Sequence, residues 1–177
     1  MIKKFLNIKK IFGFTALEAV IGVSVIAMGL LGVSSLVIQN IQVQIVNRNY
    51  LISSMLAQEG LELVRNVRDK NWITSGNDWD QGIVGDFAID YLGNIISVTG
   101  IDDPNTNLEL DNEFYCHDNG VFLCSGTDSP FARAVSVSQV LIDGGPEYYL
   151  DVLSTVRWQG RSKTYDYVAE TYLYNWK

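Results

Sequence analysis

The feature that most constrains this chain is a long apolar segment that begins directly behind a basic start. Between Ile11 and Ile38 the only charged side chain is that of Glu18. A helix over residues 14–38 rises ~1.5 Å per residue, which is enough to cross a hydrocarbon core of ~30 Å. We therefore expect this segment to span a membrane. A carboxylate well inside lipid is unfavourable by ~2.5–3.5 kcal/mol on insertion scales, so Glu18 needs an explanation beyond anchoring.

Residues 1–13 are predicted to form a short basic leader that is removed from the mature chain. Its positive charges are Lys3, Lys4, Lys9 and Lys10. Because few positive residues follow the apolar segment, the N-terminus is expected in the cytoplasm and the bulk of the chain outside it. An ordinary secretory signal is cut after its apolar core, whereas here the plausible cleavage residue, Gly13, precedes it. An uncleaved signal anchor is the alternative.

The helix is expected to continue past the membrane segment. No proline occurs before Pro104, and from Gln39 the pattern becomes amphipathic. The predicted apolar stripe comprises Ile41, Ile45, Ile52, Leu56, Leu63 and Val67. We predict one helix from about Phe14 to about Lys70, roughly 85 Å long, with an assembly half at 14–38 and an amphipathic half at 39–70. Glycine recurs at positions 22, 29 and 32, and small surfaces for close helix approach are expected at Gly29 and Gly32, together with Ser24 and Ala27.

Residues 71–177 are predicted to form a β-rich head domain outside the cytoplasm. Alternating patterns and turn signals predict six segments. These are strands at Asp86–Tyr91 and Ile95–Thr99, a hairpin at Phe114–Cys124 around Asn119-Gly120, and a meander at Ala134–Ile142, Tyr148–Gln159 and Tyr165–Trp176. One face of the antiparallel meander should cover the helix stripe. The expected fold class is therefore α+β, with a long N-terminal helix packed against a small antiparallel sheet.

The charge balance disfavours a nucleic-acid partner. The formal net charge is −7, and removing the leader leaves 9 basic against 20 acidic residues. A phosphate-binding face needs clustered Lys and Arg. The one local basic cluster, Arg157, Arg161 and Lys163, is interpreted as a solvated strand end, with a nucleic-acid contact as the alternative.

No enzyme, catalytic residue, cofactor or metal site is predicted. Outside the cytoplasm, Cys116 and Cys124 are expected to form a disulfide rather than remain thiols. Together with His117 they provide too few ligands for zinc. This histidine is the only one in the chain, and it is expected on the surface. The sequence also lacks a Gly-rich phosphate loop after a strand.

The loop from Asp103 to Asn107 carries oxygen side chains at alternate positions, a spacing that could bind calcium. An EF-hand-type loop would then require a glycine and a terminal glutamate. Those positions hold Leu108 and Phe114, so a solvated turn is the preferred interpretation.

Glu18 could find its partner at a newly formed N-terminus. If the chain is cut after Gly13, Phe14 acquires a free α-amino group four residues from Glu18. Within one helix the amine could meet this carboxylate, or the amine of one subunit could meet Glu18 of the next. Because an ion pair in an apolar setting loses its value when misaligned, such a pair could set the register between subunits.

The sequence from Lys9 through Gly13 and Phe14 to Glu18 resembles the processing site of type IV prepilins and of the related type II secretion pseudopilins. The resemblance implies that prepilin peptidase cuts after Gly13, that Phe14 becomes an N-methylated N-terminus, and that Glu18 acts in assembly. Many major pilins carry a proline about twenty residues into the mature helix. None is present there, so the resemblance favours a minor pilin.

The resemblance also implies where the protein lies and what it contacts. The subunit would sit in the inner (cytoplasmic) membrane as a single-pass protein, held by lipid, and then enter a cell-surface filament. Its partners would be other pilin subunits, prepilin peptidase and the pilus assembly platform. The alternatives are a pseudopilin of a type II secretion system, a signal-anchored extracytoplasmic binding domain that does not polymerise, and an anchored enzyme.

Overall fold

The computed structural model describes residues 13, 15–117, 124, 126–142, 145–161 and 163–175. The chain divides into two compact units, Met1–Ile45 and Val46–Lys177, and each is considered by itself. Residues 1–12 of the predicted leader lie outside the described residues, as do Phe14 and the predicted turn at Asn119-Gly120.

A single α-helix, α1, runs from Ala16 to Ile73. The prediction of one long N-terminal helix is confirmed, with an observed end three residues beyond the predicted one. Its last turn contains Lys70, whose carbonyl accepts hydrogen bonds from both the backbone N–H and the hydroxyl of Thr74. The cation favours the negative end of the helix dipole.

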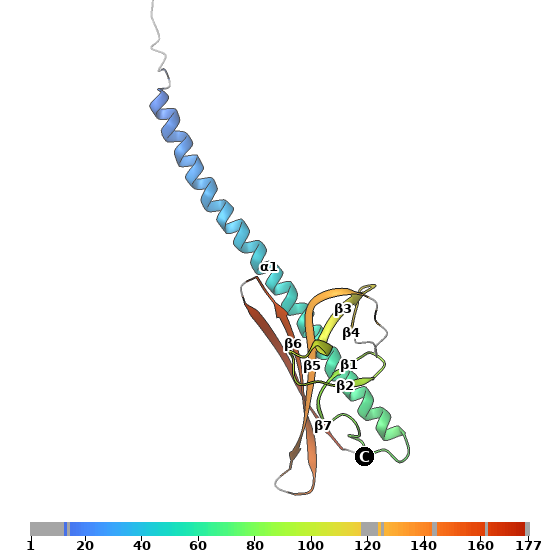
Figure 1. Cartoon of the computed structure of the whole chain (residues 1–177). Coiled ribbons are helices and arrows are strands. Elements are labelled where there is room, and N and C mark those ends of the chain that lie inside the picture. Colours follow the sequence, from blue (N-terminus) through green and yellow to red (C-terminus); the bar gives the residue numbers. More distant parts are fainter. Residues whose placement is uncertain are drawn as a thin grey trace, which may run out of the picture. The chain divides into compact units, whose positions relative to one another are not determined.

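The second unit contains one seven-stranded antiparallel sheet (Figure 1). Its strands are β1 (Gly85–Ile89), β2 (Ile95–Ser97), β3 (Asn107–Asp111), β4 (Phe114–His117), β5 (Thr127–Leu141), β6 (Tyr148–Gln159) and β7 (Thr164–Tyr174). The long strand β5 organises the sheet: β6 pairs along one of its edges, while β1 and β3 share the other edge. Strand β7 pairs with β6, so the predicted meander is confirmed, and the layout is α+β.

Two features of the sheet were not predicted. Strand β3 pairs with β4 through a tight turn at Asn112 and Glu113, which have φ values of 45° and 74°. Two positive φ values match the backbone twist of a two-residue hairpin, but the usual glycine signal is missing here. Strand β5 begins at Thr127, seven residues before the predicted start, and accommodates the exposed Pro130 beside a register shift against β3.

The helix face that packs on the sheet differs from the predicted stripe. Of the predicted residues only Leu56 is buried, whereas Ile41 and Ile45 are exposed. The buried residues of α1 are Ser53, Leu56, Ala57, Gly60, Leu61, Val64, Arg68 and Asn71. Several of these side chains are small, because a helix approaches a sheet most closely where little volume lies between them. The larger apolar residues Ile52, Leu63 and Val67 flank this contact and are half-buried.

Gly60 marks the closest approach of α1 to the sheet. A Cβ added there would overlap the Ser154 hydroxyl of β6 and lie 3.4 Å from Cδ of Arg133 on β5. Sequence analysis alone would read this glycine as an interruption of the helix. In the structure it instead allows the helix and β6 to pack directly together.

Candidate functional site

The first turn of α1 is organised by Thr15, which stands at the N-cap position. Its hydroxyl accepts a hydrogen bond from the backbone N–H of Glu18 at 3.3 Å, and its carbonyl accepts one from Ala19 at 3.2 Å. Thr-x-x-Glu is the sequence of a capping box. The helix therefore starts where the predicted processing site ends, and this capping role was missed although its signal was present in the sequence.

Glu18 is exposed and is the acidic residue in the first turn of the helix. A negative charge at a helix N-terminus is stabilising through the helix dipole, by ~0.3–1 kcal/mol at an exposed site. Gly13 is also exposed. The predicted partner of Glu18, the amine of Phe14, lies outside the described residues. The structure thus gives Glu18 a local role that does not require a second subunit.

Between Leu17 and Ile38, apolar side chains cover α1 on every side. Sixteen large aliphatic or methionine side chains between Leu17 and Ile45 are each more than half exposed. A helix that is apolar all round is normally buried in lipid or among other helices. By length and composition, α1 could span a membrane. An exposed apolar surface of this kind indicates a membrane or protein contact.

Two serine hydroxyls within this apolar part are satisfied inside the helix. The Ser24 hydroxyl donates to the Ile21 carbonyl, and the Ser34 hydroxyl donates to the Leu30 carbonyl, both at 2.8 Å. Such bonds suit a helix in an apolar environment because they leave no hydroxyl unpaired. The positions with free space for a close neighbour, judged by a Cβ added to the backbone, are Gly22, Gly29 and Gly32.

In the second unit, Cys116 and Cys124 form the expected disulfide. The expectation for His117 is wrong, because this side chain is fully buried at the end of β4. Its Nδ1 lies 3.1 Å from the carbonyl oxygen of Asn107. Burial, aided by the positive charge of Arg133, lowers the pKa of His117 to about 4. A single sequence carries no signal for this burial, because β4 is too short to show alternation.

Arg133 is a second buried charge, with 1% of its surface exposed. Its guanidinium donates to the carbonyls of Leu56 on α1 and Ile89 on β1, at 3.3 and 3.1 Å, and lies 3.2 Å from a carboxylate oxygen of Glu59. Burial lowers its pKa, and the charge of Glu59 opposes that effect. Arg133 therefore joins the helix to two strands.

The loop from Asp103 to Asn107, for which calcium binding was the alternative to a solvated turn, begins with a helical cap. Asp103 caps a 3-10 helix at Pro104–Thr106, and its two carboxylate oxygens accept from the backbone N–H groups of Asn105 and Thr99, at 3.0 and 3.1 Å. These bonds lower the pKa of Asp103. Both of its oxygens are thus engaged in capping. Within the described residues, no group of three or more His, Cys, Asp or Glu side chains could hold a metal ion.

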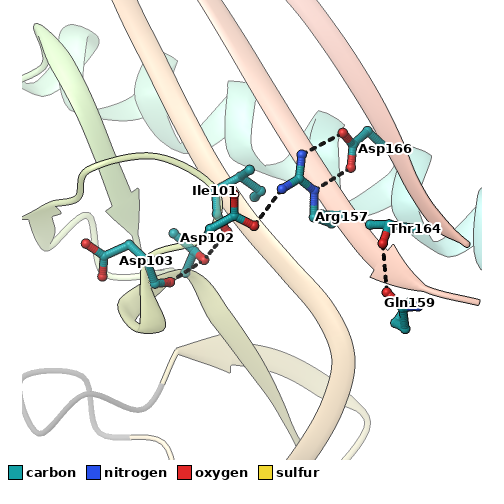
Figure 2. A network of polar contacts seen from close by, with 8 residues as sticks. Ile101, Asp102, Asp103, Arg157, Gln159, Thr164 and Asp166 are labelled. Carbon is teal, nitrogen blue, oxygen red and sulfur yellow. Dashed lines mark hydrogen bonds and ion pairs between the residues drawn. The ribbon is translucent and has the colours of Figure 1, made fainter.

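The Arg157 guanidinium on β6 lies at the centre of a surface network (Figure 2). It binds both carboxylate oxygens of Asp166 on β7, at 2.7 and 2.8 Å, and contacts Asp102 at 2.6 Å. The hydrogen bonds from the guanidinium lower the pKa of Asp166, and the two carboxylates raise the pKa of Arg157. Of the basic cluster singled out in the sequence, Arg157 is therefore neutralised within the chain.

Comparison with known proteins gives no relative. No protein-family model, curated protein or solved structure matches this chain. The functional argument therefore rests on the residues and their geometry.

Proposed function

We propose that this chain is a structural subunit, a minor pilin, of a type IV pilus-like filament. In this account the chain is cut after Gly13, is parked in the membrane through its apolar helix, and enters the filament core by packing that helix against others. The β-rich unit would remain outside, in the manner of a pilin head. A pseudopilin of a type II secretion system would use the same steps.

The observation that carries the proposal is the combination of an apolar helix exposed on every side with a processing-type sequence at its start. Lipid can cover the apolar side chains of such a helix before assembly, and neighbouring helices can cover them afterwards. Gly29 and Gly32 leave room for close helix contacts in that second environment. An anchored enzyme would need a catalytic constellation in addition to the anchor. The constellation that the sequence offered most directly, around His117, is instead part of the buried core.

Glu18 is assigned the register role in assembly, in which its carboxylate pairs with the α-amino group of Phe14 in a neighbouring subunit. Because Thr15 and Glu18 also form the N-terminal cap of the helix, a test must separate the register role of the Glu18 charge from its effect on helix stability. A glutamine at position 18 keeps the capping-box sequence and removes the charge. An alanine removes both.

The test compares Glu18→Gln, Glu18→Ala and Thr15→Ala in cells that assemble filaments, with subunit incorporation measured in sheared filament fractions. If the charge sets register, both Glu18 variants are cut normally but fail to incorporate, while Thr15→Ala incorporates. Normal incorporation of Glu18→Gln together with failure of Thr15→Ala would show that only the cap matters, and would overturn the register role.

A further inference from the structure

The outer face of β6 and β7, opposite the helix, carries a group of aromatic and acidic side chains. We call it the tyrosine patch and define it as Tyr149, Asp151, Glu170, Tyr172 and Tyr174. The strand register places Tyr149 opposite Tyr174 and Asp151 opposite Tyr172. The Tyr149 ring lies 5.4 Å from the Tyr172 ring and 5.3 Å from the Tyr174 ring. These five residues therefore form one continuous surface.

The tyrosine patch is both accessible and incompletely satisfied. Tyr172 and Tyr174 are 50% and 47% exposed. The Tyr172 hydroxyl donates to Glu170, which raises the tyrosine pKa to about 12. Oδ1 of Asp151 is shielded from solvent, yet within the described part of the chain no donor reaches it. A shielded carboxylate oxygen without a donor is unfavourable, and the carboxylate of the patch that a partner can reach is the exposed one of Glu170.

A complementary group lies at the opposite end of the same two strands. Arg161 and Lys163, which we call the basic turn, are both exposed where β6 leads into β7. The ammonium of Lys163 lies 4.4 Å from the centre of the Tyr165 ring. Because Arg157 is already neutralised by Asp166, the charge available to a partner comes from the basic turn.

Within one copy the two groups are too far apart to meet. Eight residues separate Asp151 from Gln159 on β6, which corresponds to ~27 Å at ~3.4 Å per residue. Cations from the basic turn can therefore reach the tyrosine patch only in another molecule. Arginine and tyrosine are also enriched at the cores of protein interfaces.

We propose that the basic turn of one copy of this chain binds the tyrosine patch of the next copy. The contact is heterologous, since it joins two different surfaces, and such contacts build open fibres when the rotation between copies does not close. A net charge of −7 opposes binding to nucleic acid or to an anionic lipid surface, and the local opposite charges of the basic turn and the tyrosine patch favour a second copy. The contact rests on the proposed filament function and adds a head-to-tail interface to it wherever two copies of this chain are neighbours in the filament.

The first test uses the full chain, expressed as two tagged copies in filament-forming cells. One copy carries Lys163→Cys and the other Glu170→Cys, and a mild oxidant is added to intact cells. The native cysteines are joined in a disulfide and do not compete. A disulfide-linked dimer of the two different copies is expected. Its absence, or a Lys163→Cys dimer of like copies in its place, would overturn the proposal. Pairing with Asp128→Cys, an exposed acid on β5, provides the matched control.

A charge-reversal series separates this interface from the other possibilities. Cross-linking is measured here through a third tagged pair, Arg161→Cys and Asp151→Cys. Lys163→Glu and Glu170→Lys should each reduce this cross-linking by about 10-fold or more, because each change places like charges opposite one another. Combining the two reversals should restore it, while Lys70→Glu, an exposed change of equal charge, should have no effect. Failure of the combination to restore cross-linking would contradict the contact.

The outcomes also separate this interface from the proposed function. Loss of the head-to-tail cross-link with normal processing and incorporation would refute the interface alone. An uncut chain that still cross-links would refute the pilin assignment alone. Binding of the basic turn to anionic vesicles or to nucleic acid, abolished by Lys163→Glu without any cross-link between copies, would identify a different occupant and overturn the proposal.

Discussion

The buried histidine predicts how the stability of the β-rich unit depends on pH. His117 is fully buried, its Nδ1 faces the Asn107 carbonyl, and the charges of Arg133 and Asp90 act on it in opposite directions. Burial holds its pKa at about 4 in the folded chain, against 6.5 for an ordinary histidine. Between these two pKa values, His117 therefore binds a proton in the unfolded chain and stays neutral in the folded chain.

The size of the effect follows from these two pKa values. A tenfold change in proton affinity corresponds to ~1.36 kcal/mol. Full stabilisation is present above about pH 6.5, and the free energy of unfolding falls as the pH drops from there to about 4, by about 3 kcal/mol in total. At pH 4.5 we expect His117 to account for a loss of about 2–3 kcal/mol relative to pH 7.5.

The assay is urea unfolding of the full chain in detergent micelles, followed by tryptophan fluorescence at pH 7.5 and 4.5. The matched variant is His117→Gln, which retains an amide donor for the Asn107 carbonyl and cannot titrate. We expect the variant to lose about 2–3 kcal/mol less than the native chain over this interval, whatever its stability at pH 7.5. Equal losses in the two proteins would refute the account of His117 as a neutral buried base.

Three further predictions concern packing and covalent stability, each measured in the same unfolding assay. Gly60→Ala should lower the free energy of unfolding by about 1–2 kcal/mol, because the new methyl group overlaps the Ser154 hydroxyl. Adding Ser154→Ala to the same chain should recover most of that loss, and additive effects of the two changes would contradict the contact. Arg133→Met should destabilise by about 2–4 kcal/mol because two buried carbonyls lose their donors, and an unchanged midpoint would contradict the tie between helix and strands. Replacing Cys116 and Cys124 by serine should lower stability by about 2–3 kcal/mol, as expected for closing a short loop, and a chain as stable as the native one would contradict this.

Long elements with strong periodic patterns were predictable from the sequence. Helix α1 follows from an apolar run without proline, and strands β6 and β7 follow from alternation that spans 11 or 12 residues. The disulfide followed from two nearby cysteines in a domain that is expected to lie outside the cytoplasm. Each of these signals is local in the sequence. The helix and strand patterns also repeat over many residues, so an exception at a single position does not obscure them.

Features that depend on distant contacts were not predictable. The buried face of α1 includes Ser53 and Gly60, because close packing against the sheet requires small residues there. A hydrophobicity pattern does not mark such residues as buried. Arg133 is buried inside β5 because Glu59 and two carbonyls, from other parts of the chain, satisfy it. The capping role of Thr15, in contrast, depends on a motif of four consecutive residues and could have been predicted from the sequence.

The central proposal is that the chain is cut after Gly13, which creates at Phe14 the α-amino group with which Glu18 would pair. Mass spectrometry of the N-terminal peptide from filament-forming cells tests this most directly. The account predicts a mature chain that begins at Phe14 with an N-methyl group on its α-amine. An intact Met1 in membranes of cells with active prepilin peptidase would contradict it.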